Sequence, residues 1–96
     1  MLIDELERSS ENAVVARRNL MLGVWAGKCL GYSGERLAGY ASDVMRSDYE
    51  VPGPDDVIAK VSADFAAAGL GLGPKAVRAE LKTLERRVRC EFMPTD

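Results

Sequence analysis

Residues 13–30 read AVVARRNLMLGVWAGKCL, and the spacing of their apolar side chains decides the fold class. Apolar residues recur three and four positions apart, which is the period of a helix with a wide apolar face. We expect this helix to begin before Glu11 and to end close to Gly31, which supplies a C-terminal stop. Gly23 and Gly27 lie one turn apart on one face. Because each glycine costs up to about 1 kcal/mol of helix propensity relative to alanine, the pair indicates that another helix crosses closely there. The apolar positions of this helix are Ala13, Val14, Leu20, Met21, Val24, Trp25 and Leu30.

Two further helices follow with recognisable ends. Ser33 is the predicted N-cap of a second helix that runs to about Glu50. The proline- and glycine-containing residues 51–54 then interrupt the helical pattern. A third helix opens at Pro54, has acidic residues in its first turn, and ends at the glycine-rich residues 69–73. Its predicted inward side chains are Val57, Ile58, Val61 and Phe65.

A fourth helix is predicted to start at Pro74. Its apolar residues form a core seam at helical spacing, namely Val77, Leu81, Leu84, Val88 and Phe92. No segment alternates at period two for long enough to form a strand. The sequence therefore predicts an all-α fold, a four-helix bundle that forms one domain over residues 1–96. Within it, residues 1–15 are an N-terminal arm that we expect to be mobile, and residues 16–92 are the bundle.

Length and composition exclude several classes of protein. A chain of 96 residues suits one domain, and 47% apolar residues suffice for a core. No stretch approaches the roughly 20 consecutive apolar residues of a spanning helix. The N-terminus turns acidic at Asp4 and Glu5, unlike the basic start of a secretory signal. We therefore expect a cytoplasmic protein that does not insert into the membrane.

Residues suited to catalysis or metal binding are scarce. The chain has no histidine, the commonest general base and metal ligand, and nothing supplies a pair of nucleophile and base. The two cysteines, Cys29 and Cys90, are far apart in sequence and do not form a zinc-binding pattern. We expect two reduced, partly buried thiols, with a disulfide as the alternative. The sequence predicts no enzyme, no metal and no cofactor.

Charge is segregated along the chain. Residues 1–11 hold four acids against one arginine, whereas residues 75–91 hold six basic residues against three acidic ones. These blocks nearly cancel, giving a net charge of −2, so bulk binding to nucleic acid is not favoured. The aromatic residues Trp25 and Tyr40 lie off the basic block, and we expect them in the core rather than in a base-stacking platform.

The basic block allows two interpretations. Its stripe at helical spacing comprises Lys75, Arg78, Lys82, Arg86 and Arg89. A solvated helix face, partly neutralised by Glu85 four residues before Arg89, is the simpler interpretation. The alternative is contact with an acidic surface or with an anion, such as weakly bound ADP or ATP, at Lys75, Arg78 and Lys82. The glycine run before Lys75 lacks the strand and the Gly-Lys-Ser/Thr sequence of a phosphate loop, so only a weak anion site at the helix N-terminus is predicted.

Several motifs occur in a fixed order that is more specific than any one of them. They are ARRNLMLGVWA at residues 16–26, Tyr40-Ala41 leading to Val44, DYEVPG at residues 48–53, Asp56-Val57, Lys60 and Asp64-Phe65. Together they closely resemble the zeta-type inhibitor subunit of bacterial rotary (F-type) ATP synthases. The resemblance covers roughly residues 16–92, with the tightest agreement up to Phe65.

The resemblance implies a four-helix bundle that binds the catalytic head of the ATP synthase and blocks ATP hydrolysis. In that family an N-terminal segment enters the interface between the catalytic subunits and the rotor shaft, and the bundle anchors it. The resemblance therefore places this regulatory protein at the inner face of the membrane when it is bound to the synthase. The residues that would contact the catalytic subunits are Asp4, Glu5, Glu7, Arg8, Glu11, Asn12, Arg17 and Arg18.

One departure from the family concerns the N-terminal arm. Family members carry a longer arm with phenylalanines, whereas residues 1–15 have none and would reach about 22 Å as a helix. Each phenylalanine that is absent from the interface lowers the favourable free energy of burial by about 1.5–3 kcal/mol. A loss of 1.4 kcal/mol in binding free energy weakens the affinity about tenfold. We therefore expect weak or absent inhibition, or a different partner. Two other hypotheses remain open, a nucleotide or anion sensor and a helical adaptor for an unrelated protein.

Overall fold

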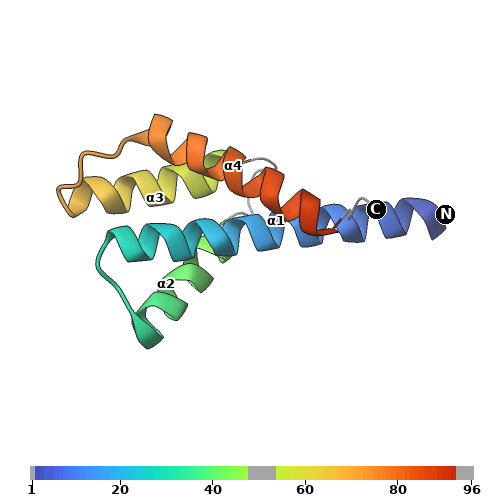
Figure 1. The fold of residues 1–96 in the computed structure, drawn as a ribbon, viewed down its shortest axis with the longest axis horizontal. Coiled ribbons are helices and arrows are strands. Elements are labelled where there is room, and N and C mark those ends of the chain that lie inside the picture. Colours follow the sequence, from blue (N-terminus) through green and yellow to red (C-terminus); the bar gives the residue numbers. More distant parts are fainter. Residues whose placement is uncertain (1, 48–53, 93–96) are drawn as a thin grey trace.

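The computed structural model describes residues 2–47 and 54–92, with side chains described at residues 11–47 and 54–91. Its helices are α1 (Leu2–Cys29), α2 (Gly34–Arg46), α3 (Asp55–Ala67) and α4 (Pro74–Phe92) (Figure 1). This arrangement confirms the predicted all-α four-helix bundle, and no strand occurs in the described parts of the chain.

The ends of α1 and α2 follow the predicted signals with one exception. Gly31 has a φ of 87°, and the Tyr32 amide next to it donates to the Gly27 carbonyl at 2.9 Å, which closes α1. Ser33 is the N-cap of α2, although its side chain makes no capping hydrogen bond. We predicted α2 to run to about residue 50, but it ends at Arg46. The amide and hydroxyl of Ser47 both donate to the carbonyl of Val44, at 3.1 and 2.7 Å, and so satisfy the end of the helix. Residues 48–50 lie outside the described part of the chain.

The ends of α3 and α4 agree with the sequence. Pro54 caps α3, and Asp55 and Asp56 occupy its first turn. After α3, Gly69 has a φ of 74°, and the amide of Leu70 donates to the carbonyl of Phe65 at 2.9 Å. This left-handed turn ends α3 as predicted, and α4 begins at Pro74.

The core lies between α1, α3 and α4, with Val44 entering from α2. All four predicted inward residues of α3 are buried, and so are four of the five seam residues of α4, the side chain of residue 92 being outside the described ones. Trp25 packs edge-on against Phe65, with ring centroids 5.7 Å apart, and Tyr40 is half-buried against the core, as predicted. On α1 the fully buried residues include Leu22 and Ala26, which the predicted stripe omitted, whereas Ala13 is exposed.

The two glycines of α1 mark the crossing of α2. A Cβ atom placed on Gly23 would lie 2.6 Å from the Cα atom of Ala41, and one on Gly27 would lie 2.5 Å from Cδ1 of Leu37. Real side chains do not tolerate the first distance, because the neighbouring atom belongs to the backbone. Gly23 therefore allows the backbones of α1 and α2 to approach closely, and Gly27 leaves room for the side chains of Leu37 and Tyr40, which confirms the predicted close crossing.

α1 is the central element of the bundle. α2 packs along α1, α4 also packs along α1, and α3 lies mainly against α4. Because α1 has two main neighbours, its apolar face is wide. Its N-terminal part continues past the end of α4 (Figure 1).

Two further predictions concern the cysteines and the possibility of a membrane-spanning helix. Cys29 and Cys90 are free thiols, as expected, but both are exposed, so the predicted partial burial is wrong. Each lies near the end of its helix and off the buried face. Within the described parts, none of the helices has the length and apolar character needed to cross a membrane.

Candidate partner-binding surface

Glu11, the first residue of α1 whose side chain is described, forms an ion pair with the last turns of α4. Two guanidinium nitrogens of Arg89 donate to the two carboxylate oxygens of Glu11, at 2.8 and 3.1 Å. The third nitrogen of the same guanidinium donates to Glu85 at 3.3 Å, which confirms the pair predicted from their four-residue spacing. Fork-shaped contacts of this kind fix direction as well as distance, because both partners are planar.

Beneath this contact lies a buried arginine. Arg18 is only 6% exposed, and its Nη1 donates to Oε1 of Glu85 at 2.7 Å while its Nε donates to Oδ1 of Asn19 at 3.0 Å. Glu85 therefore accepts from Arg18 on one oxygen and from Arg89 on the other. We call the four residues Glu11, Arg18, Glu85 and Arg89 the α1–α4 ion network.

The network stabilises the ionised form of its carboxylates. The hydrogen bond from Arg18 lowers the pKa of Glu85, and the bond from Arg89 adds to this shift while partial burial opposes it. The hydrogen bond from Arg89 likewise lowers the pKa of Glu11. The same contacts, led by the bond with Glu11, raise the pKa of Arg89. All three groups are charged at neutral pH, so the network is intact there.

The predicted partner-binding residues fall into three groups. Asp4, Glu5, Glu7 and Arg8 lie on the helical backbone of α1, and their side chains are outside the described residues. Glu11, Asn12 and Arg17 are exposed, and Arg17 also makes an ion pair with Glu91 of α4 at 3.4 Å. Arg18, by contrast, is buried and directed at α4, so in this conformation it offers little surface to a partner.

Sequence reasoning missed that the C-terminal turns of α4 form the other side of this surface. Glu85, Arg89 and Glu91 meet residues of α1 that are 67 to 78 positions away in the sequence. A pattern of neighbouring residues in the sequence does not predict contacts over such a separation. The only signal was the opposite sign of charge in the two segments, acidic before residue 12 and basic after residue 74.

The three cations predicted as an anion site lie on the outer face of α4. Lys75, Arg78 and Lys82 are exposed. Arg78 donates to Oδ1 of Asp55 at 3.2 Å, whereas neither lysine has a carboxylate partner among the described residues. The stripe is therefore partly neutralised by neighbouring acids, at Arg78 and at Arg89, as expected for a solvated face.

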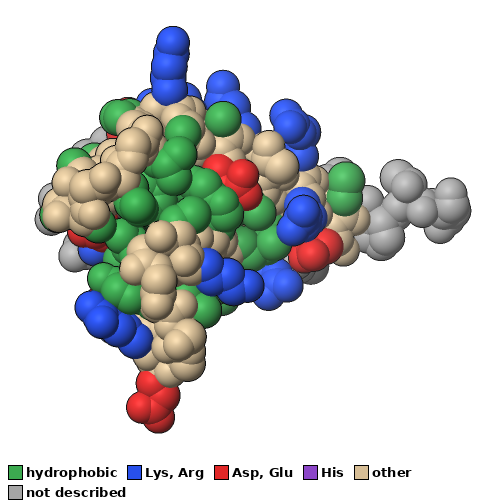
Figure 2. All heavy atoms as spheres, turned by 60° about the vertical axis from the view of Figure 1, so that its left-hand side comes forward, with side chains coloured by type: hydrophobic (Ala, Val, Ile, Leu, Met, Phe, Trp, Pro, Cys, Tyr) green, Lys and Arg blue, Asp and Glu red, His purple; other side chains and the backbone are tan. Residues whose placement is uncertain are grey.

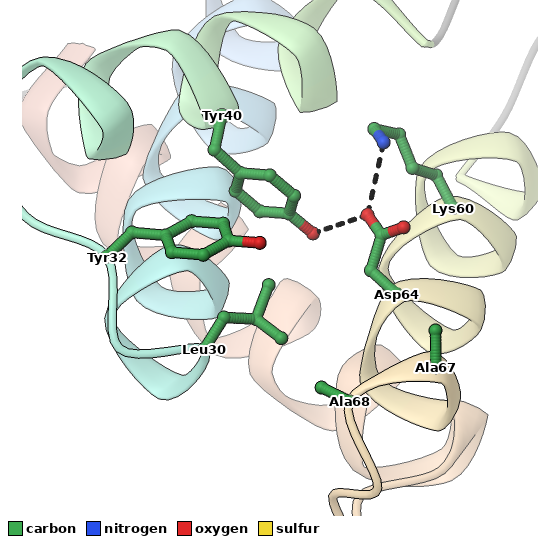
Figure 3. Close-up of a pocket in the computed structure, with 7 residues that line it drawn as sticks. All are labelled: Leu30, Tyr32, Tyr40, Lys60, Asp64, Ala67 and Ala68. Atoms are coloured by element: carbon green, nitrogen blue, oxygen red, sulfur yellow. Dashed lines mark hydrogen bonds and ion pairs between the residues drawn. The ribbon is translucent and has the colours of Figure 1, made fainter.

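A separate recess opens between the end of α1, α2 and α3. It has a volume of about 390 Å³ and is lined by Leu30, Tyr32, Tyr40, Lys60, Asp64, Ala67 and Ala68. Figure 3 shows the Tyr40 hydroxyl and the Lys60 amine pointing at Asp64, to which they donate at 2.8 and 3.1 Å. Burial, followed by the bond to Asp64, raises the pKa of Tyr40, so its hydroxyl stays protonated as a donor. Because Lys60 balances the carboxylate, the recess carries little net charge.

Apolar side chains adjoin the recess. Figure 2 shows hydrophobic side chains gathered over the middle of one face of the molecule, with charged side chains of both signs around them. Leu30, Leu70 and Leu72 are half-buried against the core at this end of the bundle. Among the residues with described side chains, no three acidic or cysteine side chains gather as they would around a metal ion.

A family model described as ATPase inhibitor subunit zeta matches residues 5–91, nearly the whole chain. The family is one of regulatory proteins, and the match supports an ATPase-inhibitory role that involves ATP synthase. Neither the search of curated proteins nor the search of solved structures gave a match. The chain therefore belongs to the ATPase inhibitor subunit zeta family.

Proposed function

We propose that this protein restrains ATP hydrolysis by binding the catalytic head of a bacterial ATP synthase through the N-terminal part of α1. Family membership supports the ATPase-inhibitory role. The observation that carries the choice of segment is the shape of α1, whose residues 2–10 continue as helix past the end of α4. A projecting helix can enter a crevice in a partner while the bundle stays outside.

The contacts we propose lie along this segment and the turns of α1 that follow it. They are made by Asp4, Glu5, Glu7 and Arg8, and by Glu11, Asn12 and Arg17, which the structure shows to be exposed. Arg18 takes a different role in this proposal. Since Arg18 is buried and bound to Glu85, it stabilises the packing of α4 against α1 next to the proposed binding segment.

The proposed inhibition is weak. Residues 1–15 contain no aromatic side chain, and aromatic anchors usually dominate the energy of an interface. All but one of the proposed contact residues are charged, and charged contacts contribute more to association rate and specificity than to affinity. We therefore expect binding that weakens as ionic strength rises.

The test is ATP hydrolysis by the catalytic head of the cognate synthase, titrated with the full chain at low and high salt. We expect partial inhibition at micromolar protein and less inhibition at high salt. The variant Asp4→Asn/Glu5→Gln/Glu7→Gln should inhibit less than the wild type. The matched control is Lys75→Gln/Lys82→Gln, which alters exposed charges on α4 instead. Unchanged hydrolysis at protein concentrations that saturate binding would overturn the inhibitory role, and sub-micromolar inhibition would overturn the weakness.

Protein capture and an NMR titration with nucleotide separate the other two hypotheses. If the head binds no protein and another protein is captured, the helical adaptor is favoured. If ADP or ATP shifts NMR signals only around Lys75, Arg78 and Lys82, the chain is a nucleotide sensor. The bond of Arg78 to Asp55 argues against that site, because a nucleotide would have to displace it.

A further inference from the structure

We infer that Arg89 is a positioning residue. Its bidentate ion pair with Glu11, which we call the clasp, fixes the direction in which the N-terminal part of α1 leaves the bundle. This inference deepens the proposed function and rests on it for its biological consequence. The clasp itself is a property of the free protein.

The place of Glu11 in α1 makes it a suitable point of control. Residues 2–10 continue the helix beyond it, over a length of about 14 Å. A tilt of about 10° at Glu11 would therefore move the tip by about 2 Å, which is enough to miss a matched crevice. Figure 1 shows that α4 ends beside this part of α1 and does not follow it further. The last turns of α4 are thus where α4 can still hold α1.

Arg89 is held more firmly than an ordinary surface arginine. Its side chain is 40% exposed, and its guanidinium binds both oxygens of Glu11 and one oxygen of Glu85. Glu85 in turn is held by the buried Arg18 at 2.7 Å. The exposed clasp is therefore connected to the interior of the bundle through a chain of charge-assisted hydrogen bonds, each of which orients the next.

Arg87 provides a matched control on the same helix. It is an exposed arginine two residues away, and no described residue forms an ion pair or hydrogen bond with it. Arg87→Gln removes the same charge as Arg89→Gln without removing a clasp. Arg89→Lys keeps the charge but loses the fork that binds both carboxylate oxygens.

The experiment is NMR-detected amide hydrogen exchange of residues 6–16 in the full free chain. In Arg89→Gln we expect these amides to exchange roughly two- to fivefold faster, while those of α2 and α3 keep their rates. Glu11→Gln should give the same effect, and the double variant should add little to either single one. Arg89→Lys should fall between Arg89→Gln and the wild type, and Arg87→Gln should match the wild type.

Two outcomes would overturn the inference. One is that Arg89→Gln and Arg87→Gln give the same exchange rates at residues 6–16. The other is that Arg89→Gln accelerates exchange equally in all helices, which would show general destabilisation instead of positioning. Because exchange is measured without the synthase, these results are independent of the proposed function. The inhibition assay adds the consequence, namely that Arg89→Gln inhibits hydrolysis less than Arg87→Gln does. Equal inhibition by these two variants would overturn the role of the clasp in binding.

Discussion

α1 is held by its two main neighbours in different ways. Against α2 it presents Gly23 and Gly27, and at Gly23 the two backbones approach until a Cβ atom would not fit. Against α4 it contributes apolar side chains to the core, and at its outer end the contact consists of the α1–α4 ion network. The contact with α2 depends on shape. The outer end of the contact with α4 depends on charge and hydrogen-bond geometry.

The difference has a consequence for how the molecule can respond to change. A contact at backbone distance cannot be adjusted gradually, because an added atom forces one helix away from the other. A network of ion pairs can lose one member and keep the rest, and it responds to salt and acid. The rigid contact lies in the part of α1 that forms the bundle, and the adjustable one lies at the base of the proposed binding segment.

The largest effect is expected at the rigid contact. Gly23→Val places a branched side chain 2.6 Å from the Cα atom of Ala41, and we expect a loss of about 3 kcal/mol in the free energy of unfolding. Chemical denaturation measures it. Gly27→Ala is the control, because its Cβ atom would meet the flexible end of Leu37, and the gain in helix propensity offsets the displacement. Equal losses in both variants would show that the distinction between backbone and side-chain neighbours is wrong.

The next effect is expected at the interior of the ion network. Arg18→Met keeps the volume but leaves Glu85 with only Arg89 as a partner, so we expect a loss of about 2 kcal/mol. Arg17→Met removes the neighbouring arginine, whose pair with Glu91 is exposed, and should cost less than about 0.5 kcal/mol. Urea unfolding of the two variants compares them directly. A larger loss at Arg17 would contradict the assignment of Arg18 as the buried support.

The ion network also predicts a dependence on pH. The hydrogen bond from Arg18 lowers the pKa of Glu85 below its ordinary value of 4.5, so the folded state binds this proton less readily than the unfolded state. The resulting stabilisation is complete above about pH 4.5 and is lost as the pH falls through the lower pKa of the folded state. Unfolding measured between pH 7 and pH 3 should therefore show a steeper acid loss for the wild type than for Glu85→Gln. Parallel profiles would contradict the network.

The smallest effect concerns a glycine that touches nothing. Gly39 lies inside α2, and a Cβ atom placed there has no neighbour within 4 Å. Gly39→Ala should therefore raise stability by up to about 1 kcal/mol, through helix propensity alone. A thermal unfolding scan measures it. Destabilisation by this variant would contradict the open space that the structure shows around Gly39.

Much of the fold could be predicted from local sequence. The N-cap at Ser33, the start of the third helix at Pro54 and the stops at Gly31 and Gly69 each depend on a residue's own backbone preferences, and each lies within one residue of its predicted position. The early end of α2 was not predicted. It involves a hydrogen bond from the hydroxyl of Ser47 to the carbonyl of Val44, and the sequence does not show whether this hydroxyl binds the backbone or solvent. The exposure of the cysteines was also mispredicted, since the residue type indicates burial on average and not at one position.

The candidate site was less accessible to sequence reasoning. The charges of Glu11 and Arg17 marked them as surface residues, and they are exposed. Arg18 has the same charge as Arg17, but it points inward because helical rotation places the two side chains on different faces. Only a known position for α4 could show which of the two would be buried.

By itself the sequence determined the all-helical architecture, several of the helix ends, the apolar seam of α4 and the glycine surface that allows a close crossing. These follow from interactions within a few residues, which a pattern of one chain records. The tertiary structure alone decided that Glu85 bridges two arginines, that Glu11 is clasped by Arg89, and that Tyr40 donates to Asp64. Each of these bonds requires a particular rotation and axial position of one helix against another. Those are set by how all four apolar faces pack together, and no single segment contains that information.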